Sequence, residues 1–387
     1  MSERPWRDRY LVFGAPSFGP EERAAVLECL DSGWVGSGPR VAEFEERFRR
    51  YVDAPAAVAV SSCTAALHLA LLALDLEPGS EVVTSPMTFA ATATAIVHAG
   101  HVPVFADCDL ATGCLDPAAL ERAIGPRTRA VVPVHFAGRP CDMAAIGRIA
   151  AERGLHVVED CAHAIEAAVD GRHCGTFGEL GCFSFYVTKN VTSVEGGMLV
   201  ARSRETAARL KTLALHGLSA DAWRRYGDEG FVHYQVEQPG FKYNMTDLAA
   251  AIALVQLGKV EAHWQRRRAL WDFYLRELAE LPLELPAPFA PGTRHALHLF
   301  TCRVDPARTA RTRDEVVQAL HGLRIGSGVH YTALHLHPWY RKRFGHEPGD
   351  FPSAESIGAR TFSIPLSPAV SDADAADVVR ALRIALA

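Results

Sequence analysis

The sequence predicts an α/β fold: a large, mostly parallel seven-stranded β-sheet with helices on both faces, followed by a small C-terminal α+β domain. Three observations support it. Short apolar runs alternate with amphipathic helical stretches between residues 55 and 205, which is typical of a parallel sheet covered by helices. Four prolines between residues 281 and 292 mark a boundary. The 387 residues exceed what one ordinary core holds. We therefore expect a large domain over residues 1–250 and a small one over 251–387.

The elements of the large domain are read from apolar, β-branched runs and from the amphipathic stretches between them. The expected strands are Ala56–Ser61, Glu81–Ser85, Val102–Ala106, Ala130–His135, His156–Asp160, Cys182–Tyr186 and Met198–Ala201. The expected helices are Thr64–Leu74, Thr88–Ala99, Pro117–Ile124, Asp142–Glu152 and Arg204–His216. Ligands of such sheets bind beyond the carboxyl ends of the strands, so the site is expected there.

The remaining elements complete the chain. Ser219–Gly240 has no clear period and is expected to be a long excursion, and a helical stretch runs from Met245 to about Ala279. After the proline-rich boundary we expect a strand over Leu297–Val304, a helix over Arg313–Leu323, a strand over Gly328–Tyr331 and a closing helix over Ala373–Ala387.

Composition and charge argue against several classes of function. The net charge of −5 gives no reason to expect a nucleic-acid or membrane partner. No apolar run approaches the roughly 20 residues that cross a bilayer, and the charged N-terminus lacks a secretory signal, so we expect a cytoplasmic protein. Nine scattered cysteines show no zinc-ligand spacing, which favours reduced thiols and no metal site.

Lysine is scarce, and one lysine has an unusual position. The chain has five lysines, none of them within the first 188 residues. Lys189 follows the apolar run Cys182–Tyr186 and precedes a loop of small residues. An ammonium at a buried strand end is unfavourable unless it is paired or neutralised, so Lys189 is a candidate Schiff-base former, the alternative being a surface loop lysine.

Two further strand ends carry polar residues suited to a charged ligand. Thr64 and the backbone amides after it begin a helix, where a phosphate binds favourably, although a plain Thr N-cap is the alternative. Asp160 ends a strand, where a protonated pyridine nitrogen would supply the cation it needs; the alternative is an N-cap for a helix over Cys161–Ala167. His163 is placed to reach the phenolic edge of such a ring, or is a satisfied polar group.

Two more residues follow strand ends on the same rim. Phe89 is a candidate for stacking on a pyridine face, although a core position is the commoner fate of a phenylalanine. Ser184 precedes Lys189 by five residues and reaches the phosphate only if the strand carries it to the same edge.

Taken together, these residues resemble the DegT/DnrJ/EryC1/StrS family of sugar aminotransferases, within the fold-type I enzymes that use pyridoxal 5'-phosphate (PLP). The resemblance covers nearly the whole chain. Its motifs lie at residues 32–39, 62–68, 86–92, 133–140, 159–163, 183–190, 195–198, 240–248 and 328–331.

The resemblance implies roles for the cofactor residues. Lys189 forms a Schiff base with PLP and moves a proton during a ping-pong reaction, and Asp160 pairs with the pyridinium. Thr64, Ala65 and Ser184 hold the phosphate, Phe89 stacks on the ring, and His163 stands where the family has Gln or His at the cofactor. The family is dimeric, and residues after Gly240 come from the partner subunit; Lys242 stands where many members have Asn, so Lys242 or Asn244 fills that role.

The resemblance also suggests substrates. The stretch from Gly240 to Asp247 and the segment His337–Arg341 are similar to members acting on C4 of nucleotide-linked 4-keto sugars. We therefore expect L-glutamate as the amino donor and a nucleoside-diphosphate-4-keto-6-deoxy sugar as the acceptor, with Trp34, His330 and Tyr331 on the substrate side.

Other assignments stay open at this stage. A C3-keto sugar or inosose aminotransferase needs the same cofactor residues. The related sugar dehydratases have His in place of the lysine, which disfavours them here, and the intact Lys, Asp and phosphate residues argue against a non-catalytic regulatory relative. Cys63 and Cys161 flank the inferred site and are reactive only if a nearby charge stabilises the thiolate.

Overall fold

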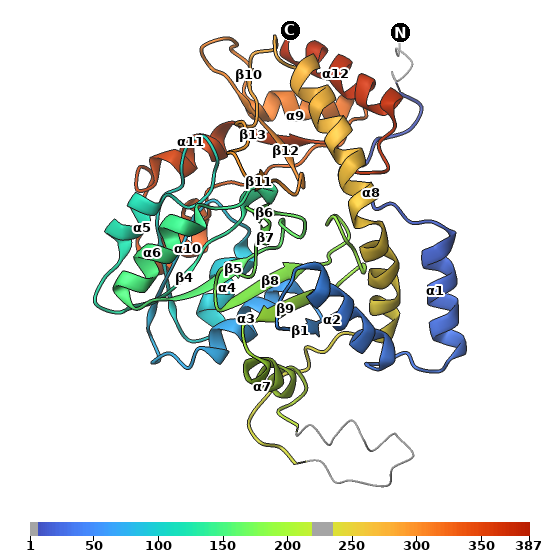
Figure 1. Ribbon diagram of the computed structural model, residues 1–387. Coiled ribbons are helices and arrows are strands. Elements are labelled where there is room, and N and C mark those ends of the chain that lie inside the picture. The colour runs from blue at the N-terminus through green and yellow to red at the C-terminus, as the bar shows by residue number, and fades with distance from the viewer. Residues whose placement is uncertain (1–6, 219–234) are drawn as a thin grey trace.

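The protein, described here from a computed structural model that covers residues 7–218 and 235–387, is built around a seven-stranded sheet (Figure 1). Its strands lie in the order β1, β9, β8, β5, β4, β2, β3. Their bounds are β1 (Ala56–Val60), β2 (Glu81–Thr84), β3 (Val102–Phe105), β4 (Thr128–Val132), β5 (His156–Asp160), β8 (Leu180–Ser184) and β9 (Gly197–Ala201). All neighbours are parallel except β9, which runs antiparallel to β8 and β1. The prediction of a large, mostly parallel sheet of seven strands is confirmed.

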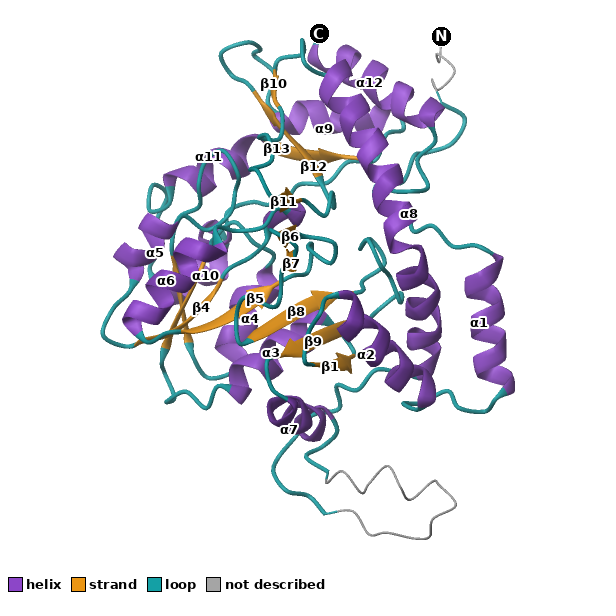
Figure 2. Cartoon of the chain, viewed as in Figure 1, coloured by secondary structure: helices purple, strands orange, loops and turns teal. Residues whose placement is uncertain are grey.

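Helices cover both faces of this sheet (Figure 2). One face packs on α3 (Cys63–Ala73), α4 (Ala90–His98) and α7 (Arg204–Ala214); the other packs on α2 (Pro39–Tyr51), α5 (Pro117–Ala123), α6 (Met143–Arg153) and α8 (Asp247–Glu277). Because side chains alternate along a strand, Val58 and Val60 enter the first core whereas Ala57 and Ala59 enter the second. Strands buried on both faces explain the nearly continuous apolar runs of the sequence.

Two N-terminal helices were not predicted. They are α1 (Pro20–Asp31), which packs on α8, and α2, both starting with a proline just after a glycine. Proline suits the first helical position, so this signal was present in the sequence. Helix α2 buries Val41, Phe44 and Phe48 against the sheet. The rings of Phe44 and Phe48 contact Phe183 of β8 and Phe185, which follows β8 on the way to Lys189.

The C-terminal part has its own core around a three-stranded antiparallel sheet. That sheet consists of β10 (Leu283–Glu284), β12 (Phe300–Val304) and β13 (Thr361–Ile364), packed on α9 (Arg313–Gly322) and α12 (Asp372–Leu386). The smaller elements are β6 (Ala168–Val169), β7 (Arg172–His173), β11 (Thr293–Arg294), α10 (Pro338–Phe344), α11 (Pro352–Arg360) and the 3₁₀ turns Phe136–Gly138 and Leu334–Leu336.

The strand predicted over Gly328–Tyr331 is wrong. Only Gly328 pairs with the sheet, through an isolated bridge to Ser363 of β13. The chain then leaves the sheet, and His330 and Tyr331 line a cavity. The helix over Cys161–Ala167, which Asp160 was alternatively expected to cap, does not form either.

Both ends of the described chain lie beside this C-terminal core (Figure 1). Leu11 pairs with Ile325, and Arg7 makes ion pairs with Asp374 and Asp377. Helix α8 joins the two parts, because its first half packs in the core of the large sheet and its second half in the C-terminal core. The domain division at residue 250 stays a prediction, and the N-terminal arm contacts the C-terminal core.

Two sequence expectations concern other parts of the chain. Most of the expected excursion over Ser219–Gly240 lies outside the described residues. Among residues 7–218 and 235–387, no helix is both long and apolar enough to cross a bilayer.

Candidate functional site: a cavity at the carboxyl edge of the sheet

A cavity of about 520 Å³ lies where β1, β5 and β8 end. It is bounded on one side by the loops after these strands and on the other by segments of the C-terminal part, including His298 and Leu366. The candidate residues that line it are Thr64, Phe89, Asp160, His163, Ser184, Lys189, His330 and Tyr331. These residues are far apart in the sequence, from Thr64 to Tyr331, and the fold brings them together at the edge where parallel sheets bind ligands.

Lys189 lies on the loop after β8, and its backbone N–H closes a turn onto the Tyr186 carbonyl at 2.9 Å. Burial lowers the pKa of Lys189 to about 8, while Cys63 and Asp160 act in the opposite direction. A pKa of about 8 leaves more of this amine uncharged near neutral pH than the ordinary value of 10.5 would, and the uncharged amine is the form that attacks a carbonyl. The surface-loop alternative for Lys189 is excluded by its place in the cavity.

Asp160 is a buried carboxylate, 4% exposed, without a cation in hydrogen-bond contact among the described residues. Its Oδ2 accepts a hydrogen bond from the Thr92 hydroxyl at 2.8 Å, and its Oδ1 accepts one from the Ala162 N–H at 3.0 Å. Burial raises the pKa of Asp160, whereas these two donors and the more distant Lys189 lower it. A buried acid held only by neutral donors is completed by a protonated ring nitrogen in the cavity.

The N-terminus of α3 forms another wall. Ser62, not Thr64, is the N-cap, and its Oγ accepts from the Ala65 N–H at 3.1 Å. The backbone of this turn lies against Gly197 of β9, where a Cβ would come within 2.4–2.7 Å of Ser62 and Cys63. The cavity is lined here by Ser62, Cys63, Thr64 and Ser184. Backbone N–H groups at the start of α3 and the hydroxyl groups of serine and threonine therefore lie at the same wall.

His163 is held in one neutral form by two contacts. Its Nδ1 accepts from the Ala137 N–H at 3.2 Å, so the ring proton is on Nε2, which donates to the Tyr331 hydroxyl at 3.1 Å. Burial first, and then the charge of Lys189, lower the pKa of His163 well below its ordinary value. The Tyr331 hydroxyl hydrogen is therefore free to point elsewhere in the cavity.

Phe89 is an exposed aromatic residue at the same site. Its ring is 62% exposed although it lines the cavity, and its nearest aromatic neighbour is Tyr331, with ring centroids 6.1 Å apart. The core alternative for Phe89 is therefore wrong. A ring face left open in a cavity is available to stack on a planar ligand.

These residues fit PLP on three independent grounds. The cavity contains an amine with a lowered pKa, a buried acid without a cation and a helix N-terminus beside hydroxyl groups. Lys189 would bond the aldehyde, Asp160 would face the ring nitrogen, and the start of α3 with Ser184 would take the phosphate.

Four candidates lie outside this cavity. Ala65 is buried behind the α3 turn, with its N–H occupied by Ser62. Trp34 and Asn244 line a second cavity of about 420 Å³ beside α2 and α7, and Lys242 is exposed near the end of α7. Within a single chain these three residues do not reach Lys189, so their assigned roles at the cofactor and substrate stay predictions that require a partner subunit.

The sequence reasoning missed several residues of the cavity wall. The Thr92 hydroxyl donates to Asp160 and lies 2.7 Å from the Thr88 hydroxyl. The sequence feature that could have indicated Thr92 is its position one helical turn after Thr88. His298 and Phe13 line the opposite wall. Nothing local in the sequence marks them, because they come from segments that the fold brings over the sheet edge.

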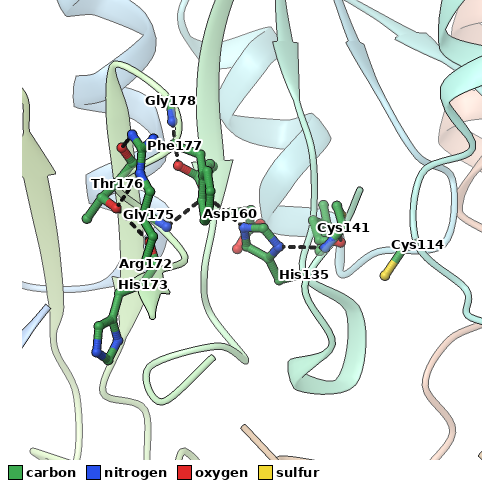
Figure 3. Close-up of polar contacts among 12 residues, drawn as sticks. Cys114, His135, Cys141, Asp160, Arg172, His173, Gly175, Thr176, Phe177 and Gly178 are labelled. Atoms are coloured by element: carbon green, nitrogen blue, oxygen red, sulfur yellow. Dashed lines mark hydrogen bonds and ion pairs between the residues drawn. The ribbon is translucent and has the colours of Figure 1, made fainter. Parts of the chain in front are cut away.

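A buried polar cluster next to Asp160 holds the loop that contains Gly175 and Gly178 (Figure 3). Glu159 accepts hydrogen bonds from His135 Nε2 at 3.0 Å and from the N–H groups of Gly175 and Gly178 at 2.7 and 2.6 Å. His135 Nδ1 accepts from the Cys141 N–H at 3.0 Å. Although His135, Glu159 and Cys161 come close enough for a metal ion, the first two already satisfy each other, so the cluster is structural.

The cysteines near the site are thiols. Burial, together with the charge of Asp160, raises the pKa of Cys63 well above its ordinary value, and burial with Glu159 does the same for Cys161. The condition for a reactive thiolate is therefore not met at either position.

Comparisons with known proteins agree with this geometry. SpsC of Bacillus subtilis, a spore coat polysaccharide biosynthesis protein, is 46% identical over 97% of this chain and 97% of its own. The PLP form of Spr1654 from Streptococcus pneumoniae matches with a TM-score of 0.90 and 29% identity, covering 97% of this chain and 98% of the other. The structure of DesI in the presence of its TDP-sugar product matches with a TM-score of 0.87 and 33% identity, covering 98% and 94%.

The family assignment follows from the match over residues 16–383. Together with the amine, acid and helix start gathered in the cavity, it establishes the chemistry. The chain belongs to the DegT/DnrJ/EryC1/StrS aminotransferase family and is a PLP-dependent aminotransferase of fold type I.

Proposed function

We propose that this sugar aminotransferase moves the amino group of L-glutamate to the C4 keto group of a nucleoside-diphosphate-4-keto-6-deoxy sugar. The observation that carries the proposal is the second wall of the cavity. Besides the residues assigned to the cofactor, Phe13, His298, His330 and Tyr331 line the same cavity, and we assign them to the substrate. DesI, a structural neighbour, was solved with a TDP-sugar product.

The residues of this chain have separate tasks in that reaction. PLP, when bound, withdraws electrons from the carbon that carries the amino group. Asp160 keeps the ring nitrogen protonated, and Thr92 holds the carboxylate in place for that task. Lys189 would move a proton at the substrate carbon, because its lowered pKa lets the amine act as both base and acid near neutral pH.

The C4 position rests on the resemblance of two segments. They are residues 240–247, with Lys242 and Asn244, and residues 337–341. We propose that one of the two residues Lys242 and Asn244 approaches the phosphate site of a partner subunit in a homodimer, because in one chain neither lines the cavity. Trp34 is proposed to reach a substrate in the same way, and we propose that the enzyme works in the cytoplasm.

The experiment compares acceptors with one enzyme. Purified PLP-loaded protein is incubated with L-glutamate and, separately, with a TDP-4-keto-6-deoxy sugar, its 3-keto isomer and an inosose. Amino products are identified by mass spectrometry and NMR. We expect the 4-amino sugar to form fastest; turnover confined to the 3-keto sugar or the inosose overturns the C4 assignment. Replacing L-glutamate with L-glutamine or L-alanine tests the donor.

A further inference from the structure

Asn190, the residue after Lys189, is the centre of a buried hydrogen-bond network. Its Nδ2 donates to Glu166 Oε2 at 2.8 Å and to the Ala296 carbonyl at 2.8 Å. Its Oδ1 lies 3.1 Å from His298 Nδ1. All three groups are buried.

The orientation of the Asn190 amide is fixed by its partners. Glu166 is ion-paired with Arg267 inside the protein, and since an arginine keeps its charge, Glu166 balances it as a carboxylate. A carboxylate and a carbonyl can only accept hydrogen bonds, so both must face the NH₂ group of Asn190. The opposite amide orientation would bring an oxygen against two acceptors, which the buried site does not tolerate.

This orientation determines the tautomer of His298. Because Asn190 presents only its oxygen, His298 Nδ1 must carry the hydrogen. The ring is neutral, since burial and then the nearby Lys189, His330, Arg267 and His295 lower its pKa well below the ordinary value. Nε2 of His298 is therefore an acceptor only.

His298 presents this lone pair to the cavity. Its ring lies on the cavity wall, and in the part of the chain that the structure describes Nε2 makes no hydrogen bond. His163, whose ring centroid is 4.4 Å away, differs, because both of its nitrogens are already engaged. The second wall thus carries an acceptor, His298 Nε2, whose tautomer is fixed by buried partners, and a hydroxyl, Tyr331, whose hydrogen is free to donate. His330 Nε2 on the same wall also makes no hydrogen bond to the described residues, but the Ser363 hydroxyl beside its Nδ1 can either donate or accept, so its tautomer is not fixed.

We propose that His298 Nε2 accepts a hydrogen bond from a hydroxyl group of the keto sugar, with Asn190 as the residue that positions it and fixes its tautomer. The inference rests on the proposed function. A sugar hydroxyl suits this site, since it donates one hydrogen and stays on the sugar throughout the reaction. The amino group of the donor must instead reach the cofactor carbon, where Lys189 lies.

Two variants of His298 separate its nitrogens. In His298→Asn the side-chain amide lies near the Nδ1 position and keeps a donor for Asn190, but nothing replaces Nε2. In His298→Gln the amide reaches the Nε2 position and offers its oxygen there. The two half-reactions are followed separately through the absorbance of the cofactor, with L-glutamate alone and then with the keto sugar.

We expect His298→Asn to lower kcat/KM for the keto sugar by about tenfold or more, as the loss of one hydrogen bond to a buried partner predicts. His298→Gln is expected to retain most of that value, and the L-glutamate half-reaction to change less than about twofold in both. His295→Asn, in the same loop but outside the cavity, is the control for general disturbance. Equal losses in the Asn and Gln variants, or an equal loss with L-glutamate, overturn the proposal.

The tautomer is tested without activity. In cofactor-free protein carrying ¹⁵N-labelled histidine, the ring signals of His298 are assigned by their loss in His298→Gln. We expect hydrogen on Nδ1 in the wild type and a mixture of tautomers in Asn190→Ala; hydrogen on Nε2 in the wild type overturns the inference. If the wild type aminates no keto sugar, the proposed function fails, whereas turnover that is unaffected in His298→Asn rejects the His298 contact alone.

Discussion

At the residue scale, the chemistry that we propose depends on two ionisable groups that are removed from water and have no charged partner in hydrogen-bond contact among the described residues. Lys189 and Asp160 influence each other's pKa across the cavity, yet neither makes a hydrogen bond to the other. An ammonium and a carboxylate in direct contact would be a stable pair. Because they are held apart, the Lys189 amine stays available to an aldehyde and the Asp160 carboxylate stays available to a protonated ring nitrogen.

The lowered pKa of Lys189 makes a prediction for cofactor-free enzyme. The folded pKa is about 8, against an ordinary 10.5, so between these values the unfolded chain binds the extra proton. Stability should therefore rise with pH across that window, by on the order of 2–3 kcal/mol. Lys189→Met should remove this rise, as measured by urea unfolding at pH 7 to 10.5. An unchanged pH dependence in the variant would show that Lys189 is not the group responsible.

The same residue can be tested with the cofactor. Lys189→Arg keeps a positive charge but cannot form the Schiff base, so we expect no visible absorption band from a lysine-bound cofactor and a fall in transamination of about a thousandfold or more. Borohydride reduction of the wild type followed by peptide mapping should place the label on Lys189; a label on Lys211 or Lys259 would contradict the assignment.

Substitutions of Asp160 and Thr92 should slow the reaction to different extents. Asp160→Asn keeps the shape but removes the charge, so the L-glutamate half-reaction should slow by about a hundredfold or more. Thr92→Val, also of matched shape, removes one hydrogen bond to the carboxylate and should slow it by about tenfold. Stopped-flow absorbance measures both. A Thr92→Val effect as large as that of Asp160→Asn would mean that the hydroxyl acts directly on the cofactor.

At the element scale, the position of the α3 N-terminus depends on a glycine of a neighbouring strand. The start of α3 packs on Gly197 of β9, and only hydrogen fits between them. The sequence pattern predicts the helix and the strand separately, but it cannot show that the two backbones touch. This contact links the motif Glu195-Gly-Gly-Met to a helix start, more than a hundred residues earlier, that we assign to the phosphate.

Gly197→Ala tests this contact. The added Cβ would come within 2.4 Å of the Ser62 backbone and push the helix start away, so we expect PLP affinity to fall by about tenfold or more and stability to fall by about 1–3 kcal/mol. The matched control is Gly147→Ala in the middle of α6, where a Cβ meets nothing within 4 Å. That variant should gain up to about 1 kcal/mol in unfolding free energy and bind PLP normally. Fluorescence titration with PLP and urea unfolding distinguish the two, and normal PLP affinity in Gly197→Ala would contradict the argument.

At the scale of the whole molecule, one chain does not bring all the expected residues to one place. Trp34 and Asn244 lie at a second cavity, away from Lys189. If the active site is shared between subunits, two defective variants should complement each other. Mixing Lys189→Ala with Asn244→Ala, unfolding and refolding together, should restore activity at roughly a quarter of all sites, because half of the dimers are hybrids with one intact site each.

The control for this experiment is a mixture of Lys189→Ala with Asp160→Asn. These two residues belong to the same cavity of one chain, so each site of a hybrid dimer carries one of the two changes and no activity should return. When Lys189→Ala and Asn244→Ala are placed on one chain and mixed with wild type, sharing makes both sites of each hybrid defective, so about a quarter of all sites should stay active, against about half if the site is not shared. Sedimentation establishes the oligomeric state in each case, and a monomer would rule out sharing.

The sequence by itself determined the elements that local patterns encode. Seven strands and the helices between them follow from runs of apolar residues, since a strand buried on both faces and an amphipathic helix differ in period. It also placed Lys189, Asp160, Thr64 and Phe89 at strand ends, and parallel topology alone then puts strand ends on one edge.

Only the tertiary structure decided what lies across the cavity from that edge. His298 and the open lone pair on its Nε2 depend on Asn190, Glu166 and Arg267, which come from three separate segments. The predicted strand over Gly328–Tyr331 failed for the same reason, because Tyr331 turns away from the sheet and its hydroxyl meets His163. Hydrogen-bond partners far apart in the chain carry no local signal, since their pairing is decided by packing rather than by the order of residues.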